Sequence, residues 1–165
     1  MLRWLMYLVK PITLDALALR PLAASDLPAF NAIYTDPNVR KYADEQVVRP
    51  LSRLFLLSQR QALELLVIEH TGTAEIVGWC GLSAVQGASP ATFEVEVFLK
   101  PSAQGQGIGA KVLSELLLIA RCLDHQIKAR VHVENFSSQG LMKKLEWFAQ
   151  DRSGEWEFWT PPAGD

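Results

Sequence analysis

The chain has 165 residues, of which 49% are hydrophobic and 21% are charged, and its formal net charge is −2. This length and composition suit one folded domain over residues 1–165 and exclude an intrinsically disordered chain. The small negative charge excludes a broad basic surface, so we expect no nucleic-acid partner.

The cysteines and the first residues point to a cytoplasmic protein. Cys80 and Cys122 are far apart and have no histidine at metal-ligand spacing, so we expect neither a disulfide framework nor a metal site. Two free thiols suit a reducing compartment. The start, MLRWLMYLVK, is apolar only from Leu5 to Val9, which is too short a run to cross a bilayer. We therefore expect no membrane span and no signal peptide, with residues 1–12 a flexible start or a first strand.

The periodicity of apolar residues predicts a mixed sheet with helices. In the first half of the chain the pattern predicts a strand in ITLDALALRPL, a helix in SDLPAFNAIYTD capped by Ser25 or Asp26, a helix over 50–63, and a hairpin of LELLVIEH and EIVGWCGLSAV. It then predicts a strand in TFEVEVFLK, a helix over 107–123 and a strand in IKARVHVEN. The chain ends with a short helix in SSQGLMKKLEW and a last strand in GEWEFWT, with one more short strand near Phe148. Antiparallel hairpins come first and one β-α-β crossover comes late. This order predicts an α/β (α+β layered) fold with a mixed, mostly antiparallel sheet of six to seven strands.

The stretch KPSAQGQGIGAKV places three glycines, Gly105, Gly107 and Gly109, in front of a helix. Such a loop lets a backbone approach a phosphate group closely. A P-loop is excluded, because Ala110 stands where its second glycine belongs and Val112 replaces the hydroxyl that holds magnesium.

A dinucleotide fingerprint, G-x-G-x-x-G/A, fits Gly105, Gly107 and Ala110 literally, and Glu134 ends the next strand where a ribose-binding acid belongs. Its context does not fit. The short remainder of the chain cannot supply the further parallel strands, and the strand before the loop alternates charged residues, whereas a parallel strand covered on both faces is continuously apolar. A dinucleotide-binding protein stays as an alternative.

A third pattern, Q/R-x-x-G-x-G/A, fits Gln104–Gly109, with the acidic strand EVEVFLKP before it and ENFSSQGLMKKLEW after the next strand. With this combination the chain resembles the GNAT superfamily of acetyl-CoA-dependent N-acyltransferases. The family's N-x-x-S/A…K-L-G-F is matched by Asn135, Ser138, Lys144, Leu145 and Trp147, with Glu146 in place of the glycine. The front stretch LALRPLAASDLPAFNAIYTDPNVRKY looks like members similar to ribosomal-protein-alanine N-acetyltransferases. The resemblance covers about residues 17–160.

The resemblance implies a GNAT fold with helices on both faces of the sheet and acetyl-CoA as acyl donor, without a metal. Backbone N–H groups at a helix N-terminus favour a pyrophosphate such as that of coenzyme A. Asn135 is also a good helix cap, and both roles stay open. The residues expected to bind the donor are Gln104, Gly105, Gln106, Gly107, Ile108 and Gly109 in the loop, Val97, Phe98 and Leu99 on the strand before it, and Asn135 and Ser138.

The resemblance further implies direct attack of a primary amine on the thioester. A backbone amide around Phe98 would polarise the carbonyl. Glu94 and Glu96 share one face of their strand and are the candidate bases, although two solvated glutamates on an exposed face would look the same. Met142 stands where many members carry a tyrosine acid, so a CoA-binding module with little catalysis remains an alternative. We expect as acceptor a small molecule or a peptide or protein N-terminus, and a monomer or homodimer.

Overall fold

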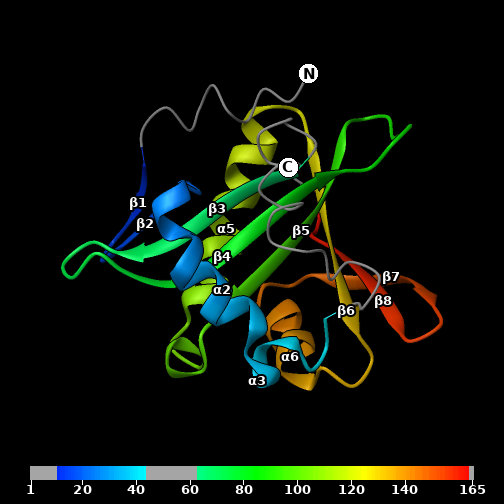
Figure 1. Ribbon diagram of the computed structural model, residues 1–165. Coiled ribbons are helices and arrows are strands. Elements are labelled where there is room, and N and C mark those ends of the chain that lie inside the picture. The colour runs from blue at the N-terminus through cyan, green and yellow to red at the C-terminus, as the bar shows by residue number, and fades with distance from the viewer. Residues whose placement is uncertain (1–10, 44–62, 164–165) are drawn as a thin grey trace. The chain divides into compact units, whose positions relative to one another are not determined.

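The computed structural model describes residues 11–43 and 63–163 (Figure 1). Its elements are β1 (Ile12–Leu14), β2 (Leu17–Pro21), η1 (Ala24–Asp26), α2 (Leu27–Thr35), α3 (Pro37–Arg40), β3 (Leu63–His70), β4 (Glu75–Ala84), β5 (Thr92–Leu99), η2 (Pro101–Ala103), α5 (Ile108–Cys122), β6 (Gln126–His132), α6 (Phe136–Lys144), β7 (Phe148–Ser153) and β8 (Trp156–Thr160). The helix predicted over 50–63 lies outside the described residues except for Leu63, which begins β3. Within the described ranges, no helix combines the length and the apolar character needed to cross a membrane.

The strands within the described residues form one eight-stranded sheet in the order β1-β2-β3-β4-β5-β6-β8-β7. β5 and β6 run parallel, whereas the pairs β1–β2, β2–β3, β6–β8 and β7–β8 are antiparallel. The mixed, mostly antiparallel α/β fold is confirmed, but the expected six to seven strands were too few. The strand predicted in ITLDALALRPL is a hairpin of two strands, which turns at Asp15 with a φ of 52°. Aspartate tolerates this left-handed conformation, and alternation alone did not reveal the turn. β7 is the short strand expected near Phe148.

The chain forms two compact units. The first contains the chain up to Gly81 together with Val97–Gln104, and the second contains Leu82–Glu96 together with Gly105 onward. β4 and β5 each contribute residues to both units.

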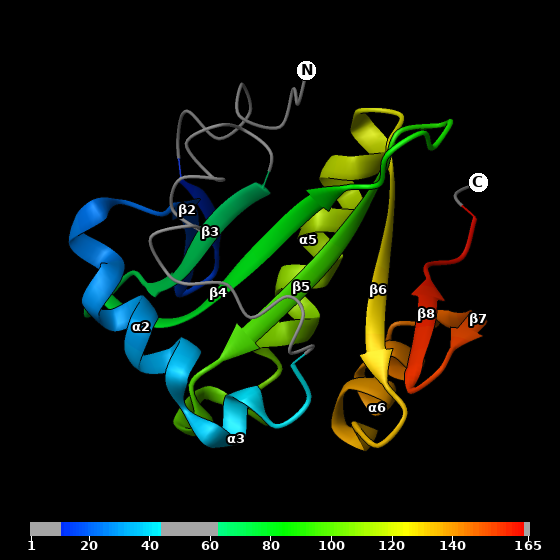
Figure 2. The ribbon, with the colours of Figure 1, turned by 45° about the vertical axis from the view of Figure 1, so that its right-hand side comes forward.

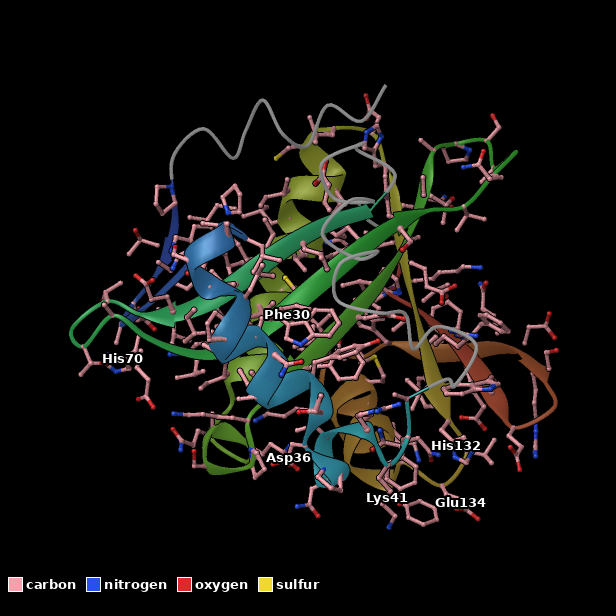
Figure 3. The ribbon with its side chains drawn as sticks, viewed as in Figure 1. Phe30, Asp36, Lys41, His70, His132 and Glu134 are labelled. Carbon is pink, nitrogen blue, oxygen red and sulfur yellow. The ribbon has the colours of Figure 1, made fainter. Side chains whose placement is uncertain are left out.

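The core of the first unit forms between α2 and strands β3 and β4. Phe30 and Ile33 lie three residues apart on α2 and are both buried, which is the spacing of one helix face. The buried residues of this cluster are Leu22, Phe30, Ile33, Leu65, Val67 and Trp79. Phe30, labelled in Figure 3, lies on α2. The centroid of its ring lies 4.9 Å from the ring centroid of Trp79 on β4.

Arg20 on β2 ties the start of α2 to β3. Its guanidinium nitrogens contact Asp26 at 2.6 and 3.0 Å and Glu69 at 2.6 and 3.0 Å. The hydrogen bond from Arg20 lowers the pKa of the buried Asp26 carboxyl. Asp26 also accepts the N–H of Ala23 at 2.8 Å, and its side chain does not cap α2. Asp26 is the N-cap residue of α2, as predicted, but its carboxylate binds Arg20 and the Ala23 N–H at the start of η1 instead of an N–H of α2.

Replacing Arg20 tests this connection. Arg20→Leu would leave two carboxylates without their cation, so we expect the free energy of unfolding to fall by about 2 kcal/mol. Urea denaturation at pH 7 measures the change. Arg121→Leu is the control, because Arg121 is exposed and makes one bond to a carbonyl; it should change stability by less than about 0.5 kcal/mol. Equal effects of the two variants would contradict a special role for Arg20.

The core of the second unit forms between α5 and the sheet. α5 buries Val112, Leu116 and Ala120, four residues apart, and α5 contacts β6. On β6 the alternate residues Ile127, Ala129 and Val131 are buried. On β5, Phe93 and Val95 are buried as well, so the intervening glutamates belong to the opposite face of the sheet. Figure 2 shows α6 beside the carboxyl end of β6.

Candidate functional site

The glycine loop leads into α5 through left-handed backbone conformations. Gly105 has a φ of 72°, and Gly107, the N-cap of α5, has a φ of 77°. Both are exposed, and a Cβ on either would meet no atom within 4 Å. Glycine is needed here for its backbone conformation, because L side chains rarely adopt such φ values. The first N–H groups of a helix have no partner within the helix, so the loop presents donors at an open surface.

Gly109 has a different environment. It is buried in the first turn of α5, and a Cβ there would lie 3.1 Å from Leu141 Cδ2 on α6. A side chain at Gly109 would therefore be tight against α6, and Leu141 would have to shift to accommodate it. At the other end of the loop, the Gln104 side chain donates to the Leu99 carbonyl at 3.0 Å. This bond fixes the loop to the end of β5.

The last residues of β5 present two different backbone edges. The Lys100 N–H donates to the Val77 carbonyl of β4 at 3.0 Å. Because backbone groups alternate in direction along a strand, those of Phe98 also point toward β4, and those of Val97 and Leu99 point to the opposite edge. The described pairing of β5 with β6 ends at Val95–Ala129, although β5 continues to Leu99.

The two candidate glutamates are both half-buried and lie in the second unit. Glu94 forms an ion pair with Arg130, in which Glu94 Oε1 lies 3.1 Å from Arg130 Nε. The Arg130 guanidinium lies 4.8 Å from the centre of the Trp156 ring on β8. Arg130 is not recognisable as a site residue from the sequence, because its contact with Glu94 depends on the register of a parallel strand pair between distant segments. The alternation of Lys128 and Arg130 with apolar residues in IKARVHVEN was the signal available.

The residues at the start of α6 are brought together. Asn135 accepts the Ser138 N–H at 3.1 Å, so its predicted role as a helix cap is confirmed. Met142 is buried and has no hydroxyl to act as an acid. Tyr34 on α2, which has the hydroxyl that Met142 lacks, stacks on Phe30 with ring centroids 5.7 Å apart in the first unit. Among residues 11–43 and 63–163, no group of three or more His, Cys, Asp or Glu side chains could hold a metal ion.

Glu64 on β3 is a buried acid that the sequence analysis missed. It is 5% exposed, and neither carboxylate oxygen has a hydrogen-bond partner among the described residues. Burial raises its pKa from the ordinary value of 4.5 to about 7. Cys80 on β4 is also buried, and its pKa is raised to about 12, first by burial and then by the nearby Glu64 charge. The sequence signal that could have indicated a buried acid is the position of Glu64 directly before the apolar run LLVI.

Known proteins resemble this chain in sequence pattern and in fold. A family model for the acetyltransferase (GNAT) domain matches residues 16–147. No curated protein matches the sequence. The structure of RimL, a ribosomal L7/L12 alpha-N-protein acetyltransferase in complex with coenzyme A, has a TM-score of 0.74 at 18% identity, covering 91% of this chain and 96% of that one.

Two further solved structures are similar. Spermidine N-acetyltransferase from Vibrio cholerae, in complex with CoA and spermine, has a TM-score of 0.72 at 19% identity, covering 88% of this chain and 93% of that chain. The structure of the yncA protein from Salmonella typhimurium with acetyl-CoA has a TM-score of 0.65 at 25% identity, and the match covers 88% of this chain and 91% of that chain.

The family match spans most of the chain, and the fold agrees with it. The chain therefore belongs to the GNAT family of acetyltransferases. It is an acyl-CoA-dependent N-acetyltransferase, and the expected structural similarity to ribosomal-protein N-acetyltransferases is confirmed.

Proposed function

We propose that this protein transfers an acetyl group from acetyl-CoA to a primary amine by direct attack in a ternary complex. The observation that carries the proposal is the loop at the start of α5, where Gly105 and Gly107 adopt left-handed conformations at an open surface. Successive N–H groups in such a loop form a concave anion site, and the helix dipole adds to it. The loop thus fits a pyrophosphate.

The donor would be held by residues of both loop and strand. In our proposal Gln104–Gly109 bind the pyrophosphate, and Asn135 and Ser138 contact the pantetheine arm. The bound donor supplies an activated thioester. We expect the polarising amide around Phe98, and strand alternation from the Lys100–Val77 bond would turn the Phe98 N–H toward β4. We therefore assign that role to the N–H of Val97 or Leu99, on the opposite edge, with the Phe98 side chain nearby.

The acceptor would be an amine on a peptide, a protein or a polyamine. This range follows the names of the similar structures, which act on ribosomal protein L7/L12 and on spermidine. We further propose a cytoplasmic monomer or homodimer. Because Met142 cannot donate a proton, water or a tyrosine such as Tyr34 or Tyr42 would protonate the leaving thiolate.

A thermal shift with acetyl-CoA, CoA and NAD tests donor binding. A ligand present at about 100 times its Kd stabilises the folded state by about 2.7 kcal/mol. We expect acetyl-CoA and CoA to raise Tm and NAD to leave it unchanged. A rise with NAD alone would support the dinucleotide alternative and overturn the proposal.

The variant Gly107→Ala tests the loop directly. A methyl group at a left-handed residue costs about 1 kcal/mol in backbone strain and occupies the space that the pyrophosphate needs. We expect Kd for CoA, measured by calorimetry, to rise about tenfold. Gly154→Ala is a matched control, because Gly154 has a φ of 59° and open space but lies in the β7–β8 turn. It should lose similar stability and bind CoA normally.

A further inference from the structure

Phe98, near the end of β5, is stacked on a buried tryptophan. The centroid of its ring lies 4.5 Å from that of Trp79 on β4, and the two ring planes differ by 20°. On α2, the rings of Phe30 and Tyr34 have their centroids 4.9 and 6.0 Å from that of Trp79. We call the rings of Phe98, Trp79, Phe30 and Tyr34 the aromatic stack, and all of them belong to the first unit. Because Trp79 and Phe30 are buried, the Phe98 ring rests against a filled core.

The backbone that carries Phe98 is also held against β4. Lys100, two residues further on, donates its N–H to the Val77 carbonyl at 3.0 Å. Gly78 follows Val77, and a Cβ there would collide with the Phe98 carbonyl oxygen. β4 and β5 are therefore in close contact at this point. Because protein interiors are close-packed, the Phe98 ring cannot retreat toward β4 without displacing Trp79.

The Phe98 ring lies beside the backbone amides that we assign to the thioester. Side chains alternate along a strand, so Phe98 points to the face of the sheet that carries Trp79, and Leu99 points to the other face. An acyl carbonyl that accepts the N–H of Val97 or Leu99 would place its carbon chain next to Phe98. Phe98 is only half-buried, so part of its ring is available for this contact.

A ring that is supported from behind limits the size of the group that it contacts. A methyl group can pack on the open part of the Phe98 ring, but each further carbon of a chain needs space that only a movement of the ring would open. Well-packed cores tolerate added methylene groups poorly, and one methylene in an apolar pocket changes discrimination by about 10- to 200-fold. The aromatic stack is therefore suited to an acyl group of two carbons.

Trp79 supports the Phe98 ring at a cost to stability. The Trp79 Nε1 atom is buried and has no hydrogen-bond partner among the described residues. An unsatisfied buried donor is unfavourable, and phenylalanine would fill the same site without it. A hydrogen bond within the described part of the chain therefore does not explain the indole at this position, whereas the width of its ring behind Phe98 does.

We propose that Phe98 limits the acyl group of the donor to acetyl, and that Trp79 is a positioning residue that keeps the Phe98 ring from moving aside. This inference rests on the proposed function, because the acyl group reaches Phe98 only if the end of β5 holds the thioester. Donors with a longer acyl chain, such as butyryl-CoA, meet the ring and bind less well. Removal of the ring admits them.

Calorimetry with CoA, acetyl-CoA and butyryl-CoA tests the inference on wild type, Phe98→Ala, Trp79→Phe and Phe158→Ala. Wild type should bind butyryl-CoA at least about 20-fold more weakly than acetyl-CoA. In Phe98→Ala this difference should fall to about threefold or less, because butyryl-CoA itself binds about tenfold more tightly than to wild type. Damage to the fold would not produce such a gain in affinity. Trp79→Phe, which keeps a smaller ring behind Phe98, should give an intermediate difference.

Phe158→Ala is the matched control, because Phe158 is also a half-buried phenylalanine on a strand but lies on β8 in the second unit. It should keep the wild-type difference between the two acyl donors. CoA has no acyl group, and it should bind wild type and all variants within about threefold, because the glycine loop holds its pyrophosphate. With spermidine or a hexapeptide that begins with serine as acceptor, kcat/KM for butyryl-CoA relative to acetyl-CoA should rise at least about tenfold in Phe98→Ala.

Equal binding of acetyl-CoA and butyryl-CoA by wild type would show that the Phe98 ring sets no limit, and would overturn the inference while leaving the proposed function intact. An unchanged difference in Phe98→Ala would place the acyl group elsewhere. If Phe98→Ala does not fold, Trp79→Phe decides in the same way. An equal effect of Phe158→Ala would reduce the change to general loosening of the fold. If wild type binds neither CoA nor acetyl-CoA, the proposed function fails at its first step and the inference fails with it.

Discussion

Glu64→Gln is expected to raise the free energy of unfolding by about 3 kcal/mol at pH 8 and by little at pH 4.5. The side chain is buried, and burial raises its pKa from 4.5 to about 7. A shift of this size corresponds to about 3 kcal/mol, because each pKa unit is worth about 1.4 kcal/mol. Glutamine has nearly the same shape and carries no charge at any of these pH values.

The direction of the pH dependence follows from the raised pKa. Below pH 4.5 the carboxyl is protonated in both the folded and the unfolded chain, so its contribution to stability is fully present. Between pH 4.5 and about 7 the unfolded chain releases the proton and the folded chain keeps it, so stability falls as pH rises. Above pH 7 the folded protein holds an ionised carboxylate that burial has removed from water, and the loss is complete.

Urea denaturation of wild type and Glu64→Gln between pH 4.5 and 8 measures the difference in unfolding free energy. Glu134→Gln, at an exposed glutamate after β6, is the control and should give a difference close to zero throughout. A difference for Glu64→Gln that stays constant with pH would show that the Glu64 pKa is the same in the folded and the unfolded protein, and would contradict the assignment.

Gly78→Ala is expected to lower the free energy of unfolding by about 3 kcal/mol. A Cβ at Gly78 on β4 would collide with the Phe98 carbonyl oxygen, which is a backbone atom and cannot rotate away, and would lie 2.6 Å from Leu99 Cδ2. β4 and β5 would have to separate at the residues that we assign to the thioester. Scanning calorimetry should show a fall in Tm of roughly 6–12 °C.

Gly140→Ala is the opposite control. Gly140 lies inside α6, and a Cβ there meets nothing within 4 Å. Alanine favours the helix over glycine by about 1 kcal/mol, so this variant should be more stable than wild type. If Gly78→Ala were as stable as Gly140→Ala, the close approach of β4 to Phe98 would not exist in solution.

The sequence predicted the elements whose pattern is local. TFEVEVFLK alternates, so β5 and the shared face of Glu94 and Glu96 followed directly, and the helical spacing after Gly107 predicted α5. Contacts that depend on which residues of distant strands lie side by side could not be predicted from the sequence. Arg130 reaches Glu94 only because β6 pairs in parallel with β5. In the sequence Glu64 is one glutamate in a strand pattern, and its burial is apparent only from the folded structure.

The strand end from Val97 to Leu99 has a consequence for how the donor is recognised. Backbone groups on one edge of a strand need partners, and the described ladder with β6 ends before Val97, while the Leu99 carbonyl accepts the Gln104 side chain. A molecule with its own amide groups, such as the pantetheine arm, would complete the sheet as an added strand does in β-augmentation. Its attachment would then depend on main-chain atoms, so the side chains at Val97 and Leu99 could change while the protein still holds the same donor.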